Sequence, residues 1–314
     1  MINVATGVLH FSIEDIILPG KVNLVWGRYY STALLKSKRL KSNPLGLGWR
    51  NPYFATLTLN KKQYVFVNGE GQVGLFNDKD NRLITGEMLQ ELRSFWGLSI
   101  DYPHYVVTNW PSKDKDHLLR YVFKADSEKK TFLLIGIEDA TGQGLDLLYD
   151  RQGSLIQIRQ RLEQRTLTLH YTYDTQYRIS KVTLTRFQKP EMLLAHYDYD
   201  PKGRLKTAYD AKNQAEHYRY DDQHRMVSKT QKNGAVYKFQ FDYEGRCVHH
   251  TGPNDYDEKQ LLFLERICYT AVTDSLDAIT QYHWLPETGQ VYQQTDPLAR
   301  ITKTEYDAQG RIIA

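Results

Sequence analysis

Acidic and basic side chains that could bind a ligand or exchange protons gather in one short stretch of this chain, Tyr197–Leu205, with the sequence YDYDPKGRL. Paired carboxylates can carry out acid–base catalysis, and Asp-rich loops bind Ca²⁺ where several oxygens converge. The lysine and arginine of the same stretch could hold a phosphate. Whether the stretch is a reactive site or a charged turn depends on how often it occurs.

The stretch is one of six copies of a short motif. Tyr or Phe precedes Asp in each copy, and successive copies start 24, 26, 21, 21 and 65 residues apart. A weaker copy, from Trp284, lies in the longest gap. A recurring period of this length is typical of repeat proteins, so the motif is predicted to be structural. Its candidate site residues are Asp150 and Gly153; Asp174 and Arg178; Asp200, Gly203 and Arg204; Asp221 and Arg225; Asp242, Gly245 and Arg246; and Asp307, Gly310 and Arg311.

Each copy is predicted to form the turn of a β-hairpin. Asp takes the first position of a β-turn, where its carboxylate can accept local backbone N–H groups. Gly three residues later supplies the positive φ that follows a type I turn in a hairpin. Tyr177 and His224 replace this glycine, and because such residues disfavour positive φ, we expect those two turns to be tighter or differently shaped. The arginines are expected to pair with a carboxylate across strands or to lie over an aromatic ring.

The elements that position these turns are predicted to be strands. Apolar and polar residues alternate on both sides of each turn, as in a sheet with one buried face. A weaker set of turn sequences lies between the copies, and the chain's 23 tyrosines also favour strands. The sequence therefore predicts an all-β array of stacked antiparallel hairpins. The weaker turns are at 138–143, 209–214, 251–254 and 295–300, and the expected core residues of the sheet are Leu155, Tyr199, Leu205, Tyr220 and Phe241.

Two segments are predicted to depart from the strand pattern. Apolar residues from Met88 to Trp96 recur at helical spacing, which indicates a short helix near 85–97. Residues 255–267 are predicted to form a second short helix or an irregular insert.

Composition and local motifs argue against several classes of function. The net charge of +4 comes from 41 basic and 37 acidic residues without a dense basic run, so we expect no nucleic-acid binding. No run of 18 apolar residues predicts a membrane span, and no ordinary signal peptide or disulfide framework is visible. Motifs for nucleophiles, metalloproteases and nucleotides are also missing.

A zinc site is the remaining metal hypothesis. Cys247, His249, His250 and Cys268 have side chains that bind zinc. Their spacing matches no standard site, and alternate residues of a strand face opposite sides of the sheet. We therefore predict no catalytic residue, no cofactor and no metal.

The repeated motif resembles that of the Rhs/YD-repeat family, whose signature is Y-D-x-x-G-R-[LI] at a period near 21. The copies that end at Leu205 and Ile312 match it fully, and the copy that ends at Cys247 matches up to the cysteine. Residues 78–137 match the family least. The N-terminal third resembles the segment that precedes the repeats in bacterial Rhs proteins, in TGVLHFSIEDIILPG from Thr6, VNLVWGRYYST from Val22 and PLGLGW from Pro44.

The resemblance implies a hollow shell of β-hairpins that spirals around a toxic C-terminal polypeptide. Bacterial members are polymorphic toxins, delivered by type VI secretion or in toxin complexes, and their animal relatives, the teneurins, are adhesion proteins. We accordingly divide the chain into an N-terminal β segment (1–77), a connecting β segment with the short helix (78–137) and the YD repeats (138–314). Together they are expected to form a curved, partial β-shell.

The expected function is that of a non-catalytic shell fragment that encapsulates or shields a polypeptide cargo, in interbacterial competition or host attack. No spike domain, self-cleavage motif or toxin domain is recognisable, so we expect a fragment, a truncated gene product or one subunit of an assembly. The expected partners are the rest of an Rhs shell or a toxin cargo, secretion-spike proteins or glycans, and further copies of the chain through open strand edges. The protein would be bacterial, cytoplasmic before export and secreted by a non-classical route.

An alternative function is that of an adhesion module built from the same repeats. Exposed rows of Tyr and Trp suit carbohydrate or protein surfaces. Reproducible glycan binding that is lost on Tyr→Ala changes would favour this alternative.

Overall fold

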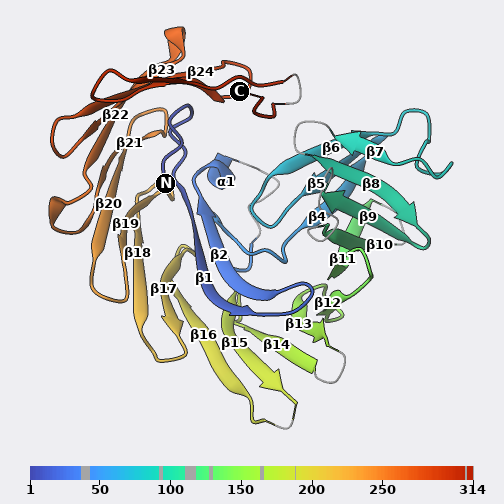
Figure 1. Cartoon of the computed structure of the whole chain (residues 1–314). Helices are drawn as coiled ribbons and strands as arrows, with labels where there is room; N and C mark the ends of the chain where they lie inside the picture. Colours follow the sequence, from blue (N-terminus) through green and yellow to red (C-terminus); the bar gives the residue numbers. More distant parts are fainter. Residues whose placement is uncertain are drawn as a thin grey trace.

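The structure is a computed structural model, and nearly all of its regular structure is antiparallel β-sheet (Figure 1). One long row of hairpins curves around a small central sheet, so the predicted all-β hairpin array with a curved, open shape is confirmed. The structure describes residues 1–36, 43–91, 95–109, 118–126, 130–162, 166–187, 189–307 and 310–313.

The central sheet is formed by β1 (His10–Leu18), β2 (Leu24–Ser31) and β3 (Trp49–Arg50), in that order. A four-residue helix, α1 (Ala33–Lys36), follows β2. Most residues of β2 are buried, because the sheet lies on the concave side of the long row (Figure 1).

The next eight described strands close into a ring. Each strand lies beside its neighbour in sequence, and β4 also pairs with β11 through Thr58 and Thr131, which closes the ring. Aromatic rings fill its interior, with the ring of Phe66 4.9 Å from Trp96 and 6.1 Å from Phe123. The strands are β4 (Thr56–Asn60), β5 (Gln63–Val67), β6 (Val73–Asn77), β7 (Leu89–Glu91), β8 (Trp96–Asp101), β9 (His104–Asn109), β10 (Arg120–Ala125) and β11 (Thr131–Glu138).

Strand β11 belongs to both the ring and the rest of the row. Its first residues pair with β4, and its last three, Gly136–Glu138, pair with β12. The register against β10 shifts between Leu134 and Gly136, which marks a β-bulge. Because a bulge bends the strand that carries it, the two halves of β11 can serve two sheets. The predicted boundary between residues 77 and 78 falls inside the ring.

From β11 onward the row continues as a strip in which each strand pairs with the next. No pairing joins β26 to β4 among the described strands, so the strip is open at β26. The further strands are β12 (Gly144–Tyr149), β13 (Leu155–Arg161), β14 (Thr166–Tyr173), β15 (Ile179–Arg186), β16 (Met192–Tyr199), β17 (Leu205–Asp210), β18 (Ala215–Tyr220), β19 (Met226–Thr230), β20 (Val236–Phe241), β21 (Cys247–Thr251), β22 (Lys259–Leu264), β23 (Tyr269–Asp274), β24 (Ile279–Trp284), β25 (Val291–Thr295) and β26 (Ile301–Lys303).

The curvature of the strip has a repeated local cause. At the hairpin of β16 and β17, Tyr199 pairs with Leu205 and Asp198 pairs with Thr207, which leaves Lys206 as an extra residue. The same register shift occurs in the other hairpins of the Tyr-Asp rim, from β12–β13 to β24–β25, with β22–β23 as the exception. Because each bulge adds a residue on one strand and increases the local twist, a bulge in nearly every repeat bends the strip.

The helix predicted near 85–97 is wrong. Residues 89–91 and 96–101 are the strands β7 and β8, paired from Leu89↔Leu98 to Glu91↔Trp96, and residues 92–94 lie outside the described chain. The buried side chains of Leu89, Trp96 and Leu98 belong to the aromatic core of the ring. The buried positions of these two short paired strands imitate helical spacing in the sequence.

Residues 255–267 contain no α-helix in their described part. Strand β22 (Lys259–Leu264) lies between two 3-10 turns, Pro253–Asp255 and Glu265–Ile267. The segment is therefore one more strand of the strip, with irregular turns at its ends.

Candidate functional site: the repeat corners and the concave face

The turn that follows each Tyr-Asp pair, here called a YD corner, is best formed at Asp200. One carboxylate oxygen of Asp200 accepts the backbone N–H groups of Lys202 at 3.0 Å and Arg204 at 2.9 Å. The other accepts Nε of Arg204 at 2.6 Å. Gly203, at φ +78°, donates its N–H to the carbonyl of Asp200 at 2.9 Å. Both oxygens of the aspartate are therefore bonded within its own turn.

The corner at Asp200 is also fastened to the next repeat. The guanidinium of Arg204 lies 5.2 Å from the ring centroid of Tyr220 and donates to the carbonyl of Asp221 at 2.8 Å. In return, the hydroxyl of Tyr220 donates to the carbonyl of Leu205 at 2.8 Å. Neighbouring repeats are thus joined by a cation–π contact as well as by backbone pairing. The same contact joins Arg178 to Tyr199 at 4.5 Å, Arg225 to Phe241 at 4.8 Å and Arg246 to Phe263 at 5.0 Å.

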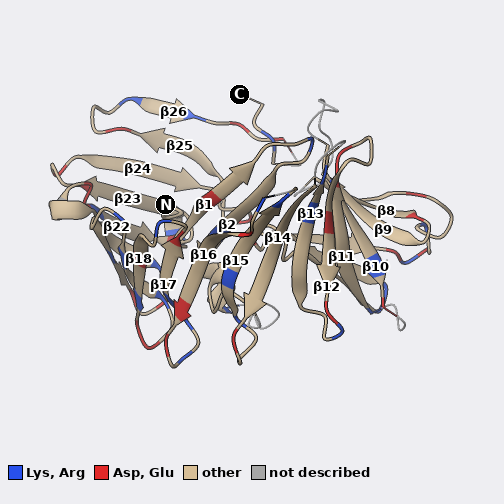
Figure 2. Ribbon diagram, turned by 90° about the horizontal axis from the view of Figure 1, so that it is seen from below, with Lys and Arg blue, Asp and Glu red and all other residues tan. Residues whose placement is uncertain are grey.

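The corner aspartates are held in their charged form. Partial burial on its own raises the pKa of Asp174, Asp200 and Asp242, but hydrogen bonds from the turn and from the arginine four residues later hold each pKa below its usual value. At neutral pH each of these three corners is therefore an ion pair, and acidic and basic residues gather at the turns of the strip (Figure 2).

The structure spreads the predicted site residues along one rim of the strip and does not bring them into one site. In every copy the backbone N–H of the fourth residue after Asp donates to the carboxylate of that Asp. The corners are Asp150 with Gly153, Asp174 with Arg178, Asp200 with Gly203 and Arg204, Asp221 with Arg225, Asp242 with Gly245 and Arg246, and Asp307 with Gly310 and Arg311.

The two corners without glycine have the same shape as the others. Tyr177 has φ +58° and His224 has φ +65°, and each donates its N–H to the preceding Asp carbonyl at 3.1 Å. The expectation of tighter or differently shaped turns is therefore wrong. The side-chain bonds of Asp174 and Asp221 fix the turn strongly enough to hold a non-glycine residue at positive φ.

The long gap in the motif contains a repeat that the sequence analysis missed. Phe263 lies 22 residues after Phe241, takes the place of the tyrosine beneath Arg246, and precedes the turn at Glu265–Ile267. Arg246 also pairs with Glu265 at 2.7 Å. The spacing to Phe263 was the available signal, but neither Asp nor Gly follows it.

The concave face of the strip is joined to the central sheet by aromatic side chains. Nε1 of Trp26 donates to the hydroxyl of Tyr197 at 2.6 Å, and the backbone N–H of Met226 donates to the hydroxyl of Tyr30 at 2.8 Å. All four residues are buried. The central sheet therefore completes the hydrophobic core of the strip.

A buried network of charges lies at the same contact. Arg28 donates to Asp15 at 2.8 Å and to Glu216 at 3.1 Å, and Lys229 lies 3.6 Å from Glu216. Burial raises the pKa of Glu216, but Arg28 and Lys229 outweigh it and leave that pKa below its usual value. Sequence reasoning missed this network, because Arg28 and Glu216 are 188 residues apart and Glu216 belongs to no motif.

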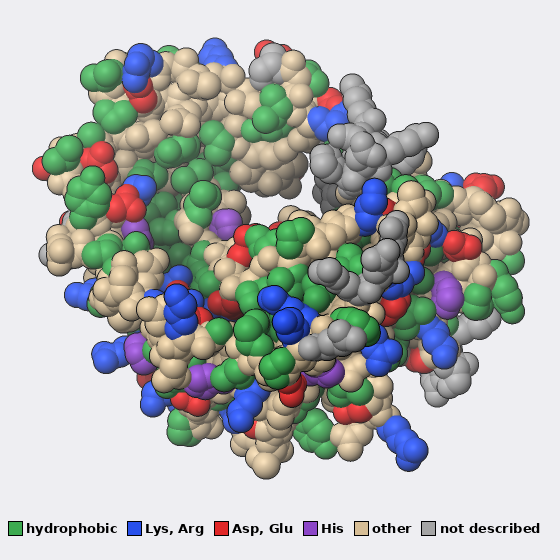
Figure 3. All heavy atoms as spheres, turned by 60° about the horizontal axis from the view of Figure 1, so that its bottom comes forward, with side chains coloured by type: hydrophobic (Ala, Val, Ile, Leu, Met, Phe, Trp, Pro, Cys, Tyr) green, Lys and Arg blue, Asp and Glu red, His purple; other side chains and the backbone are tan. Residues whose placement is uncertain are grey.

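Contacts of the N-terminal region extend over much of the strip. Gln160 of β13 donates to the carbonyl of Val22 at 3.0 Å, and Thr270 of β23 donates to that of Val4 at 2.6 Å. A space-filling view shows that the molecule is hollowed beside the central sheet (Figure 3). The strip therefore surrounds a segment of its own chain and leaves part of its concave side open.

The zinc hypothesis finds no support in the positions of its residues. Burial raises the pKa of the Cys247 thiol to about 12, so this side chain is a protonated core residue. His249 pairs with Glu258 at 2.6 Å, and His250 stacks on Phe239. Within the described chain no three His, Cys, Asp or Glu residues gather as a metal site.

No helix in the described part of the chain is long and apolar enough to cross a membrane.

A curved sheet of hairpins fastened by Tyr-Asp corners defines the class of YD-repeat shell proteins. Family models agree: residues 112–297 match the teneurin YD-shell, and residues 1–76 match a domain of unknown function, DUF6531. The chain belongs to the teneurin YD-shell family and carries repeats of the Rhs/YD type. A comparison with curated protein sequences finds no match.

A comparison with solved structures finds toxin complexes that are similar to this chain at low sequence identity. The crystal structure of TcdB2-TccC3-Cdc42 is 12% identical, with a TM-score of 0.38 over 84% of this chain and 17% of that chain. The Tc holotoxin pore of Photorhabdus luminescens is 11% identical, with a TM-score of 0.36 over 84% of this chain and 16% of that chain. The chain thus spans about a sixth of the length of these structures.

Proposed function

We propose that this chain is a non-catalytic section of an Rhs-type toxin shell that encloses or shields a polypeptide cargo. The observation that supports it best is the continuous curved strip with a hollowed concave side (Figure 3). Within this proposal residues 138–314 form the wall, residues 1–77 fill part of its concave side, and residues 78–137 connect the two. The YD corners act as structural fastenings of the wall.

The proposed partners are the rest of the shell and a toxin polypeptide. Strand β26 pairs with β25 on one side and has no described strand on the other, so its free edge suits a further strand of the shell or a second copy. The setting we propose is a bacterium that exports the shell by type VI secretion or in a toxin complex, for competition with other bacteria or attack on a host.

Protection of an attached polypeptide tests this function. An unstructured polypeptide with several trypsin sites is joined to the C-terminus of the full chain and, as a control, to an unrelated β-protein of similar size. Trypsin is expected to cleave it several-fold more slowly on this chain, and expression is expected to leave bacterial growth unchanged.

Three results would contradict the proposal. Cleavage at the control rate would show that the strip shields nothing, and growth arrest would reveal an activity of the chain itself. Specific glycan binding that is lost in Tyr243→Ala, whose side chain is 92% exposed, would favour the adhesion module instead.

A further inference from the structure

The corner at Asp150 differs from the corners that follow it. Ser154 stands at the position where they carry arginine, and Tyr173 is the next aromatic residue of the motif. Tyr173 keeps its hydrogen bond to the carbonyl of Leu155 at 2.8 Å. Within the described chain, however, no arginine lies over its ring as Arg178 lies over Tyr199. The arginine–aromatic contact that joins neighbouring repeats is therefore missing between these two.

A cavity of about 560 Å³ lies at this position. The residues that line it come from the corner, the neighbouring strands and the segment after β3, and include Ser154, Tyr173, Tyr149, Phe132, Tyr53 and Arg50. Its volume is in the range of pockets that hold small molecules, and six of its seventeen lining residues are aromatic. The cavity thus occupies space that an arginine side chain would fill in another repeat.

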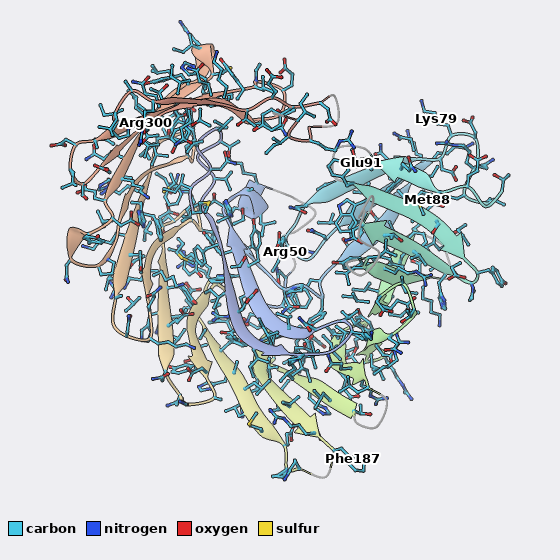
Figure 4. The ribbon with its side chains drawn as sticks, viewed as in Figure 1. Arg50, Lys79, Met88, Glu91, Phe187 and Arg300 are labelled. Atoms are coloured by element: carbon cyan, nitrogen blue, oxygen red, sulfur yellow. The ribbon has the colours of Figure 1, made fainter. Side chains whose placement is uncertain are left out.

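Arg50 supplies a positive charge to this cavity from a different part of the chain. Its side chain points to the inner side of the curve (Figure 4) and the residue is 4% exposed. Nε donates to the carbonyl of Gly69 at 3.2 Å, and Nη2 donates to the carbonyls of Asn68, at 3.2 Å, and Phe54. All three acceptors are neutral backbone groups.

The charge of Arg50 lacks a counter-ion within the described chain. Arg28, the other buried arginine, pairs with Asp15 and Glu216. Burial lowers the pKa of Arg50 to about 10, and no acid raises it again, so the side chain remains charged at neutral pH. A buried charge without an opposite charge is unfavourable, and an anion in the cavity would relieve this.

We propose that the cavity binds a carboxylate attached to an apolar or aromatic group. Nη1 of Arg50, which makes none of the three carbonyl bonds, would donate to the carboxylate, while the apolar group would lie on the ring of Tyr173. A phosphate fits less well, because its second charge would find no second cation among the lining residues. A free small molecule and the C-terminal residue of a polypeptide offer the same chemistry.

Calorimetric titration of the full chain tests the site with two matched pairs of probes. The small-molecule pair is 3-phenylpropionate and 3-phenylpropionamide, and the peptide pair is acetyl-Gly-Phe with a free or an amidated C-terminus. We expect at least one acid to bind and its amide to bind at least tenfold more weakly. Binding of the free acid alone identifies a small-molecule site, and binding of the peptide acid alone identifies a polypeptide site.

Two variants complete the test. Arg50→Gln is expected to weaken binding of the acid at least tenfold. Ser154→Arg supplies the missing arginine over Tyr173 and fills the cavity. It is expected to abolish binding of the acid, while the unfolding midpoint stays the same or rises. Ser275→Arg, on an exposed turn, is the matched control and should bind like the unaltered chain.

The proposal is wrong if neither acid binds, if acid and amide bind equally, or if Ser154→Arg binds as well as its control. Should Arg50→Gln fail to fold, the acid–amide comparison and Ser154→Arg still decide the question.

Discussion

Two parts of the strip share the same repeat but differ in what covers them. Where the central sheet lies on the strip, Val182, Leu205 and Met226 are completely buried. In β24–β26, which extend past that sheet (Figure 1), the inner-face residues Gln294 and Thr302, which pair with each other, are exposed. Turns of both parts nevertheless have the same hydrogen bonds, as at the YD corner of Asp200 and at the turn of Asp296.

The comparison separates two contributions to the stability of the strip, local hydrogen bonds at the turns and burial of the inner face. A YD corner is fixed by groups within five residues of each other, so it forms wherever its sequence occurs. Burial of the sheet's inner face instead depends on a segment far away in the sequence. The following changes test this separation, beginning with the one expected to have the largest effect.

Removal of an aromatic contact between the central sheet and the strip should be the most damaging change. Trp26 is completely buried and lies 5.1 Å from the ring of Tyr171. Trp26→Ala is expected to lower the free energy of unfolding by about 3–5 kcal/mol, measured by urea titration. Tyr243→Ala, at an exposed corner, should change it by no more than about 0.5 kcal/mol. Equal losses would show that the central sheet contributes no more than a surface residue.

The buried charge network should respond next, and its effect should depend on pH. Glu216→Gln leaves Arg28 without one of its partners and is expected to destabilise by about 3 kcal/mol at neutral pH. The pKa of Glu216 is lowered in the folded state from 4.5, so its stabilisation is present above about pH 4.5 and is lost as pH falls through the lower folded pKa.

The difference in unfolding free energy between the unaltered chain and Glu216→Gln should therefore shrink as the pH is lowered below 4.5. Urea titrations of both proteins over a pH series measure it. A difference that stays constant down to pH 2 would contradict a role for the charged carboxylate.

The YD corner at Asp200, beneath the central sheet, should matter more than the turn at Asp296, which lies beyond it. Asp200→Ala removes three hydrogen bonds from a partly buried ion pair and is expected to cost about 2 kcal/mol. Asp296→Ala, whose partner Arg300 is 76% exposed, should cost less than about 1 kcal/mol. Thermal unfolding measures both, and Asp200→Asn, which keeps an acceptor for the turn, should lie between wild type and alanine. A larger loss at Asp296 would reverse the comparison.

The smallest effect is expected at the corners without glycine. His224→Gly relieves a residue at φ +65° and is expected to stabilise by about 0.5–1 kcal/mol. The reverse change, Gly203→Ala, should destabilise by a similar amount, because Gly203 has φ +78°. If both variants unfold at the temperature of the unaltered chain, the sign of φ does not limit the stability of these turns.

The sequence allowed the local part of the fold to be predicted well. Strand alternation and the spacing of Asp200 and Gly203 were enough to predict hairpins and their stacking, because both depend on residues close together in the chain. The helix near 85–97 failed for the same reason: spacing alone does not distinguish one helical face from two short paired strands, and the core around Trp96 decided between them.

The contacts of the concave face could not be predicted. Trp26 and Arg28 have partners that are more than 170 residues away, at Tyr197 and Glu216. No periodic pattern records such a pairing, and the position of the cavity depends on the absence of one arginine at Ser154 together with the presence of Arg50. Only the folded chain brings these residues together.

The central sheet also sets an order of construction. Its strands leave the ribosome before every strand of the strip, and domains begin to fold from the N-terminus during synthesis. Each new repeat therefore meets two surfaces that already exist, the preceding corner with its arginine and the exposed side of β2. Hairpins of the strip can thus pair one at a time on the central sheet as they are synthesised. Because each new hairpin meets only the preceding one, mispairing among hairpins of similar sequence is reduced.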